Sequence, residues 1–211
     1  MKLDWLNAKH SFSFGHWMDP ERMGYRSLRV LNEDRVAPSG GFPTHPHDNM
    51  EIITYVLSGA IAHKDSMGNE EVLRAGELQR MTAGSGITHS EFNPSDSEEL
   101  HLLQIWAFPE EKGLKPSYEQ RRVEGDGLFL AVSRDERDGS MKVHQDLDLW
   151  ITHGGEATHE LAAGRGAYVH VATGTATING EKLVAGDALA IEDEPEVELN
   201  ADGTVLLFDM K

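Results

Sequence analysis

Two short pairs of metal-binding side chains stand out in the sequence, and each pair skips one residue. The first is His45-Pro46-His47 and the second is His89-Ser90-Glu91. In extended chain, residues i and i+2 point to the same side, so two facing strands would bring four donors to one ion. Three imidazoles and one carboxylate leave positions open on a six-coordinate metal, whereas a structural zinc site is normally closed by four ligands. The spacing therefore predicts a reactive metal centre at His45, His47, His89 and Glu91.

A purely structural explanation competes with this one, in which His45 and His47 face solvent and His89 caps a loop. Glu51 is a candidate fifth ligand, but we expect it to be structural or to support the ligands from behind. His63 and His101 are single histidines, which are more often hydrogen-bonded structural groups than ligands.

Short strands and tight turns must position the two pairs. Pro43 and Pro46 favour extended chain around the first histidines. Glu51 to Leu57 is rich in β-branched and aromatic residues and predicts a strand, with Ala60 to Lys64 as its hairpin partner. Further strands are expected at 71–74, 78–82 and 101–108, and a glycine-rich loop at 83–86 leads to His89. Many short strands separated by glycine-containing turns indicate a β-barrel or a β-sandwich.

The flanking segments extend this pattern. Tyr25 to Leu31 alternates like a strand, and Asn32-Glu33-Asp34 is expected to be its turn. Glu110 to Arg122 is polar and contains Gly113 and Pro116, which predicts a connector between two halves. A second series of short strands is expected from Leu128 to Ser133 and from about Trp150 to Phe208.

An internal repeat relates the two halves. Val56-Leu57-Ser58-Gly59 matches Val171-Ala172-Thr173-Gly174, and the glycine turn at Gly76 matches the one at Gly186. Asn179-Gly180 predicts a type I′ hairpin turn in the second copy. The repeat aligns the four proposed ligands with residues that do not form a second site: Glu160, Ala162, Leu199 and Ala201. His153 and His159 are expected to be surface histidines.

Composition narrows the classes of function. The chain has 211 residues, 39% of them hydrophobic, which is enough for a substantial core. It has no cysteine, so histidine and carboxylate must carry any metal chemistry. A formal charge of −17 argues against direct nucleic-acid binding. There is no apolar leader at the N-terminus and no apolar run that would cross a membrane, so we expect a cytoplasmic protein without a membrane partner.

At these motifs the chain resembles the cupin superfamily and, within it, the pirin-like proteins. The first cupin motif corresponds to Gly40, His45-Pro46-His47, Glu51 and Gly59, and the second to Thr82–Glu91. Both depart from the general cupin spacing in the direction of pirin-like proteins. The resemblance also covers His10–Phe14, Thr54–Gly59, Asp65–Asn69 and His144-Gln145-Asp146.

The resemblance implies an all-β bicupin, with a metal-binding cupin domain at 1–122 and a cupin-like domain without metal ligands at 123–211. One divalent transition metal would be held by His45, His47, His89 and Glu91. We expect Fe(II), with Ni, Mn, Co, Cu or Zn as alternatives, because histidine and glutamate do not select one ion. The resemblance also implies a link to quercetin 2,3-dioxygenase activity in bacterial members and to transcriptional co-regulation in eukaryotic ones.

The function expected is therefore a metal-dependent dioxygenase that cleaves a flavonol-like aromatic substrate with O2. Glu91 is the expected catalytic proton acceptor, since it is the one carboxylate among the four proposed ligands. Five residues near the ligands in sequence are candidates for the wall of an apolar pocket, although for each one taken singly we expect a core position instead: Phe42, Met50, Met81, Ile87 and Trp106. Two alternatives are a metal-binding regulator that acts through a protein partner, and a cupin oxygenase or isomerase acting on another small molecule.

Overall fold

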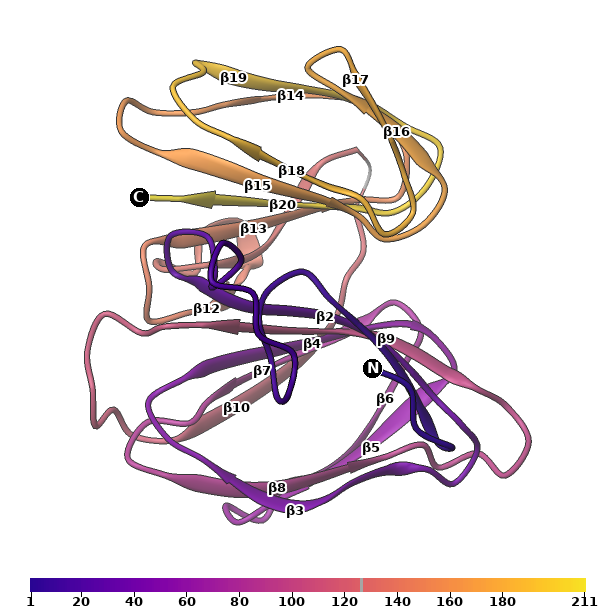
Figure 1. The fold of residues 1–211 in the computed structure, drawn as a ribbon. Coiled ribbons are helices and arrows are strands. Elements are labelled where there is room, and N and C mark those ends of the chain that lie inside the picture. The colour runs from indigo at the N-terminus through magenta and orange to yellow at the C-terminus, as the bar shows by residue number, and fades with distance from the viewer. Residues whose placement is uncertain (126) are drawn as a thin grey trace. The chain divides into compact units, whose positions relative to one another are not determined.

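The structure, a computed structural model, describes residues 1–125 and 127–211 and divides into two compact units, Met1–Val123 and Glu124–Lys211 (Figure 1). Apart from one 3₁₀ turn, η1 (Arg137–Gly139), the described regular elements are all strands. No helix in the described part of the chain has the length and hydrophobicity needed to cross a membrane. The prediction of an all-β chain is confirmed.

The first unit contains ten strands in two sheets. One sheet has the order β1-β2-β9-β4-β7-β10 and the other β3-β8-β5-β6, and all pairings between named neighbours are antiparallel. The strands are β1 (Leu6–His10), β2 (Leu28–Val36), β3 (Gly41–His47), β4 (Glu51–Ser58), β5 (Ala60–Asp65), β6 (Glu70–Arg74), β7 (Glu77–Thr82), β8 (Ile87–Phe92), β9 (Leu100–Ala107) and β10 (Ser117–Arg122).

The second unit repeats the four-stranded sheet and the central strands of the six-stranded sheet, whereas the edges of the six-stranded sheets differ. Its sheets have the orders β12-β11-β13-β20-β15-β18 and β14-β19-β16-β17. The strands are β11 (Phe129–Ser133), β12 (Met141–Lys142), β13 (Leu147–Thr152), β14 (Gly155–Glu160), β15 (Gly166–Val171), β16 (Thr175–Ile178), β17 (Glu181–Val184), β18 (Ala188–Ile191), β19 (Glu196–Ala201) and β20 (Val205–Met210). The order β3-β8-β5-β6 corresponds to β14-β19-β16-β17, so the repeat predicted from sequence is present in the topology. Asn179 and Gly180 both have positive φ between β16 and β17, as the predicted hairpin requires.

The predicted hairpin between Glu51–Leu57 and Ala60–Lys64 is wrong. β4 pairs with β7 and β9, whereas β5 pairs with β6 and β8 in the other sheet. Gly59 lies between them with φ +77°, and a Cβ there would approach the carbonyl oxygen of Glu99 to 2.8 Å. This glycine lets the chain leave one sheet and enter the other.

The polar segment predicted as a turn lies inside a strand, and the end of the polar segment predicted as a connector forms another strand. Asn32, Glu33 and Asp34 lie inside β2, where flanking strands supply partners: the Asn32 side chain bonds to His10 (2.7 Å), and Glu33 accepts from His101 (3.0 Å). The 110–122 segment ends in β10, which pairs with β7. β10 lies at the edge of its sheet, where polar side chains are common.

Candidate metal centre and cavity

The two histidine-containing pairs are brought together by β3 and β8, which lie side by side in the four-stranded sheet (Figure 1). His45 is the direct cross-strand partner of His89. Gly41 allows the two strands to approach closely, because a Cβ at this position would lie 2.4 Å from the carbonyl oxygen of Glu91. Skip-one spacing on two paired strands thus produces a compact cluster.

Three histidine rings form this cluster. The ring centroids of His45 and His89 lie 4.5 Å apart, those of His45 and His47 4.8 Å, and those of His47 and His89 4.9 Å. One ring nitrogen from each lies within 4.8 Å of the others. A second group of three metal-binding side chains consists of His63, His89 and Glu91, whose ligand atoms also lie within 4.8 Å of one another. His89 therefore links the three histidines to the carboxylate.

The protonation of the histidines suits metal binding, which requires a neutral imidazole. Burial lowers the pKa of His47 to about 4 and that of His89 to about 3, and the neighbouring histidines act in the same direction. A ring nitrogen of His45, Nδ1, lies 2.8 Å from the carbonyl oxygen of Pro43. Such a backbone contact fixes the ring and directs its other nitrogen, Nε2, toward the cluster.

The buried nitrogens of His89 provide a test of whether an ion fits. His89 is 1% exposed, and neither ring nitrogen has a hydrogen-bond partner among the described residues. Buried polar atoms in proteins are normally paired. An ion held by this cluster would give one of these nitrogens its partner, so the residues present fit a metal.

Glu91 is held by a row of polar side chains that crosses three strands of the six-stranded sheet. Gln104, Thr54 and Gln79 are register partners on β9, β4 and β7. Gln79 donates to Oε1 of Glu91 (2.8 Å), and Gln104 donates to Oε2 (3.0 Å). Burial raises the pKa of Glu91 to about 7, although the hydrogen bonds oppose the shift. The carboxyl is therefore fixed in place and able to exchange a proton near neutral pH.

Sequence reasoning missed this polar row. Thr54 interrupts an apolar run in β4 and Gln104 interrupts one in β9, which was a visible signal, whereas Gln79 lies among other polar residues in β7. An isolated polar residue on a buried strand needs a partner. The partner here is Glu91, which lies on the other sheet and which no local pattern connects to the row.

The cluster opens into a cavity of about 370 Å³ within the first unit. Its apolar wall consists of Phe14, Phe42, Pro43, Ile52 and Trp106. The other named wall residues are Asn32, Asp34, Thr44, His45, His47, His89, Glu91 and Gln104. Phe42 and Trp106 thus lie where a pocket was sought from sequence, whereas Met81 and Ile87 belong to a buried apolar cluster against which Met50 packs. An apolar cavity with a few polar groups suits a small aromatic molecule.

The remaining acid and histidine candidates lie in different surroundings. Glu51 is fully buried and accepts a hydrogen bond from Thr82 (3.0 Å). His63 lies beside His89, with ring centroids 5.3 Å apart, and its Nε2 is 3.3 Å from Asp65. His101 pairs with Glu33 on the six-stranded sheet.

In the second unit His153 is exposed, whereas His159 is only partly exposed. The side chain of His159 is 12% exposed and its Nε2 lies 2.9 Å from the buried carboxylate of Asp209. Asp209 also accepts from Arg165, which in turn donates to Asp146 (2.6 Å). Asp146 of the His144-Gln145-Asp146 motif is therefore part of a hydrogen-bonded network of charged side chains with Arg165 and Asp209.

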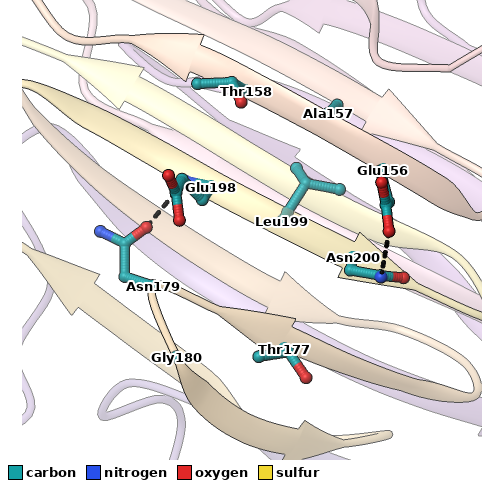
Figure 2. A pocket seen from close by; sticks show the side chains of 9 residues that line it. All are labelled: Glu156, Ala157, Thr158, Thr177, Asn179, Gly180, Glu198, Leu199 and Asn200. Carbon is teal, nitrogen blue, oxygen red and sulfur yellow. Dashed lines mark hydrogen bonds between the residues drawn. The ribbon is translucent and has the colours of Figure 1, made fainter.

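A second hollow, of about 390 Å³, lies over β14, β19 and β16 and is much more polar (Figure 2). Its side chains are partly paired among themselves: Asn200 donates to Glu156 (2.8 Å), and Asn179 accepts from the backbone N–H of Glu198 (2.7 Å). Neither group of metal-binding side chains found among the described residues includes a residue of this hollow. The cavity beside His89 is therefore the better candidate for a reaction site.

Two barrel-like units of one topology, with a histidine cluster between the sheets of the first, define a bicupin. Two family models match the chain: Pirin over residues 1–107 and Quercetinase C-terminal cupin domain over residues 130–210. The chain belongs to the pirin family, which confirms the resemblance found in the sequence.

Individual relatives agree with this assignment. Quercetin 2,3-dioxygenase of Escherichia coli K12 is 50% identical over 212 residues, covering 98% of this chain and 92% of the relative. The crystal structure of the E. coli bacterial pirin YhhW in complex with nickel(II) matches with a TM-score of 0.95 at 49% identity, covering 100% of this chain and 93% of that one. A quercetin 2,3-dioxygenase structure from Acinetobacter baumannii shares the fold, with a TM-score of 0.73 at 24% identity over 98% of this chain and 79% of that one.

Proposed function

We propose that this protein is a metal-dependent dioxygenase of the quercetin 2,3-dioxygenase type, which cleaves a flavonol-like substrate with O2. The observation that carries the proposal is the position of the histidine cluster and buried Glu91 on the wall of a largely apolar cavity. The names of the relatives support the same reaction class.

The proposed ion is a single divalent transition metal held by His45, His47, His89 and Glu91. Fe(II) is our proposed physiological ion, and the structure of the E. coli relative in complex with nickel(II) supports nickel(II) as an alternative. We place the ion in the N-terminal domain only. On β19 of the second unit, which corresponds to β8, the buried residues Val197, Leu199 and Ala201 belong to an apolar core.

When bound, the ion would act as a Lewis acid that lowers the pKa of a flavonol hydroxyl group. Glu91 would accept the proton released from that hydroxyl, because it is the one carboxylate among the four proposed ligands and it lies on the cavity wall. Gln79 and Gln104 would hold the carboxyl oriented toward the substrate. Phe42, Ile52 and Trp106 would pack against the aromatic rings and exclude water.

The test is to load the purified protein separately with Fe(II), Ni(II), Mn(II), Co(II) and Cu(II) and incubate each form with quercetin in air. Loss of flavonol absorbance and oxygen uptake are followed together. His45→Ala and Glu91→Gln should abolish or strongly reduce turnover, whereas Glu70→Gln, on the exposed edge of β6, serves as the matched control. Bound metal without oxygen uptake for any ion would overturn the proposed reaction.

A further inference from the structure

The cavity wall includes a carboxylate that belongs to neither group of metal-binding side chains. Asp34 lies on β2, two residues after Asn32, so both side chains lie on the same face of the strand, and both line the cavity. Asp34 is 4% exposed. A buried carboxylate beside an apolar cavity requires a partner, because burial of an unpaired charge is unfavourable.

The hydrogen bonds of Asp34 are incomplete. Its Oδ1 is buried and has no hydrogen-bond partner among the described residues. Glu33, the adjacent residue on the opposite face of β2, provides a contrast, because it accepts from both His101 and Lys9. The same strand therefore holds one fully paired structural carboxylate and one whose oxygen is left unsatisfied at the cavity.

A second unpaired polar atom belongs to the same cavity. The indole Nε1 of Trp106 is buried without a hydrogen-bond partner among the described residues. Glu91 and Asn32, by contrast, are engaged with Gln104 and His10. An unpaired acceptor and an unpaired donor on one largely apolar wall are the arrangement expected where a ligand completes the hydrogen bonds.

We propose that Asp34 determines specificity in this cavity by hydrogen bonding to a ring hydroxyl of a planar, polyhydroxylated aromatic substrate. The hydroxyl concerned is a different one from that which loses its proton to Glu91. This inference rests on the proposed function for the substrate class, but it assigns a role that metal binding and proton transfer do not require. Burial is the main cause that raises the pKa of Asp34, to about 7, so the carboxyl has both acceptor and donor capacity near neutral pH.

The test measures binding, without turnover, in the metal-loaded protein under anaerobic conditions. Dissociation constants are determined from the flavonol absorbance change for quercetin and for flavonols that each lack one of its ring hydroxyls. Asp34→Leu replaces the two carboxylate oxygens by methyl groups on a side chain of the same branching, and Asp34→Asn retains hydrogen-bonding capacity. Ile52→Val is the matched control, because Ile52 lines the same cavity and the change removes one apolar carbon.

In the wild-type protein, removal of one particular hydroxyl should weaken binding by about 10-fold, the size expected for a hydrogen bond to a charged group. In Asp34→Leu, removal of the same ring hydroxyl should change the dissociation constant by less than about twofold. Asp34→Asn should retain part of the wild-type preference for the flavonol that carries this hydroxyl. Ile52→Val should change all affinities by a similar factor. Metal content and thermal stability are measured for every variant, so that a folding defect is recognised.

The proposal is overturned if Asp34→Leu and Asp34→Asn discriminate among the flavonols as the wild type does, or if no flavonol binds. Discrimination that depends on Asp34, in a protein that never consumes oxygen, would support this inference while contradicting the proposed dioxygenase activity. Failure of this inference and failure of the proposed activity can therefore be told apart.

Discussion

Glu91 combines two proposed roles at the scale of single residues, as a metal ligand and as a proton acceptor. Its carboxyl is 2% exposed and receives hydrogen bonds from Gln79 and Gln104, which keep it in place whether or not it carries a proton. The three histidines can contribute the larger part of the ion's binding, because His45, His47 and His89 already form a group without it. Loss of Glu91 should therefore affect proton transfer more than metal content.

We predict that Glu91→Gln lowers turnover of quercetin by about 100-fold or more, the usual range for loss of a general base. Metal content, measured by elemental analysis of the purified variant, should fall much less. His89→Ala should lose most of the metal, because His89 belongs to both groups of metal-binding side chains. Equal loss of metal in the two variants would contradict separate roles for these residues.

The four ligands could be proposed from sequence because residues two apart on a strand point to the same side, and the structure places His45, His47 and His89 in one group and Glu91 with His89 in another. The residues that support them could not be identified in the same way. Thr54, Gln79 and Gln104 come from three strands, and only the sheet register aligns them. Asp34 was assigned to a turn because polar residues in succession favour turns, and the partners that keep its strand intact lie far away in the sequence.

At the scale of elements, the close pairing of β3 and β8 determines the shape of the histidine cluster. Gly41 faces Glu91 and Phe92 across this pair, and an added Cβ would lie 2.4 to 2.6 Å from their atoms. Backbone atoms are among these neighbours, so the strands themselves would have to separate. Any such separation changes the distance between the first and second pairs of ligands.

Gly41→Ala should therefore lower the free energy of unfolding by about 1 to 3 kcal/mol, the range for overpacking a filled site. It should also weaken metal binding, although no ligand is altered. Denaturant unfolding and metal titration measure the two effects. Thr88→Ala, at an exposed position on the same strand pair, should leave both nearly unchanged. Wild-type metal affinity in Gly41→Ala would show that strand spacing does not control the site.

Strand β2 is stabilised by the buried pairing of Glu33 with His101, and this pairing predicts a pH dependence of stability. The hydrogen bond from His101 is the largest influence that lowers the pKa of Glu33, to about 2, whereas the ordinary value is 4.5. A lowered pKa in the folded state contributes stability above the unfolded-state value. That contribution is lost as the pH falls from about 4.5 toward 2.

We expect Glu33→Gln to cost about 2 kcal/mol at pH 7, as for a hydrogen bond to a charged group. The difference from wild type should shrink between pH 4.5 and pH 2. Glu70→Gln breaks a pair with Lys64 in which both side chains are mostly exposed, and it should cost less than about 1 kcal/mol. A Glu33→Gln effect that does not vary with pH would contradict the assignment.

Strand positions were largely predictable because β-branched and apolar runs marked them, but strand pairing was not. The hairpin predicted from Ser58-Gly59 failed because a turn signal states where the chain bends and not which sheet it enters. Asn179-Gly180 succeeded because a two-residue loop with two positive φ angles leaves little freedom for anything but a hairpin.

At the scale of the whole molecule, a duplicated topology carries different side chains in its two copies. β8 presents His89 and Glu91, whereas the corresponding strand β19 presents Leu199 and Ala201 within an apolar core. The sequence repeat predicts the same difference, because it aligns the proposed ligands with residues that do not form a second site. Metal binding should therefore stabilise the first unit and leave the stability of the second unit unchanged.

Removal of the ion with a chelator should lower hydrogen-exchange protection in peptides that cover β3 and β8. A ligand present at 1,000 times its Kd contributes about 4 kcal/mol, so the loss should be readily measured. Peptides from β15 and β20 should keep their protection. Equal loss of protection in both units would contradict a metal site confined to the first.

The central claim is that the cluster of His45, His47, His89 and Glu91 supports dioxygen chemistry on a flavonol. The measurement that tests it most directly is incubation of the metal-loaded protein with quercetin under ¹⁸O₂, followed by mass spectrometry of the product. The account predicts that both labelled oxygen atoms enter the cleaved product, and that His45→Ala and Glu91→Gln give little or none. Unlabelled product, or quercetin recovered intact with metal still bound, would contradict it.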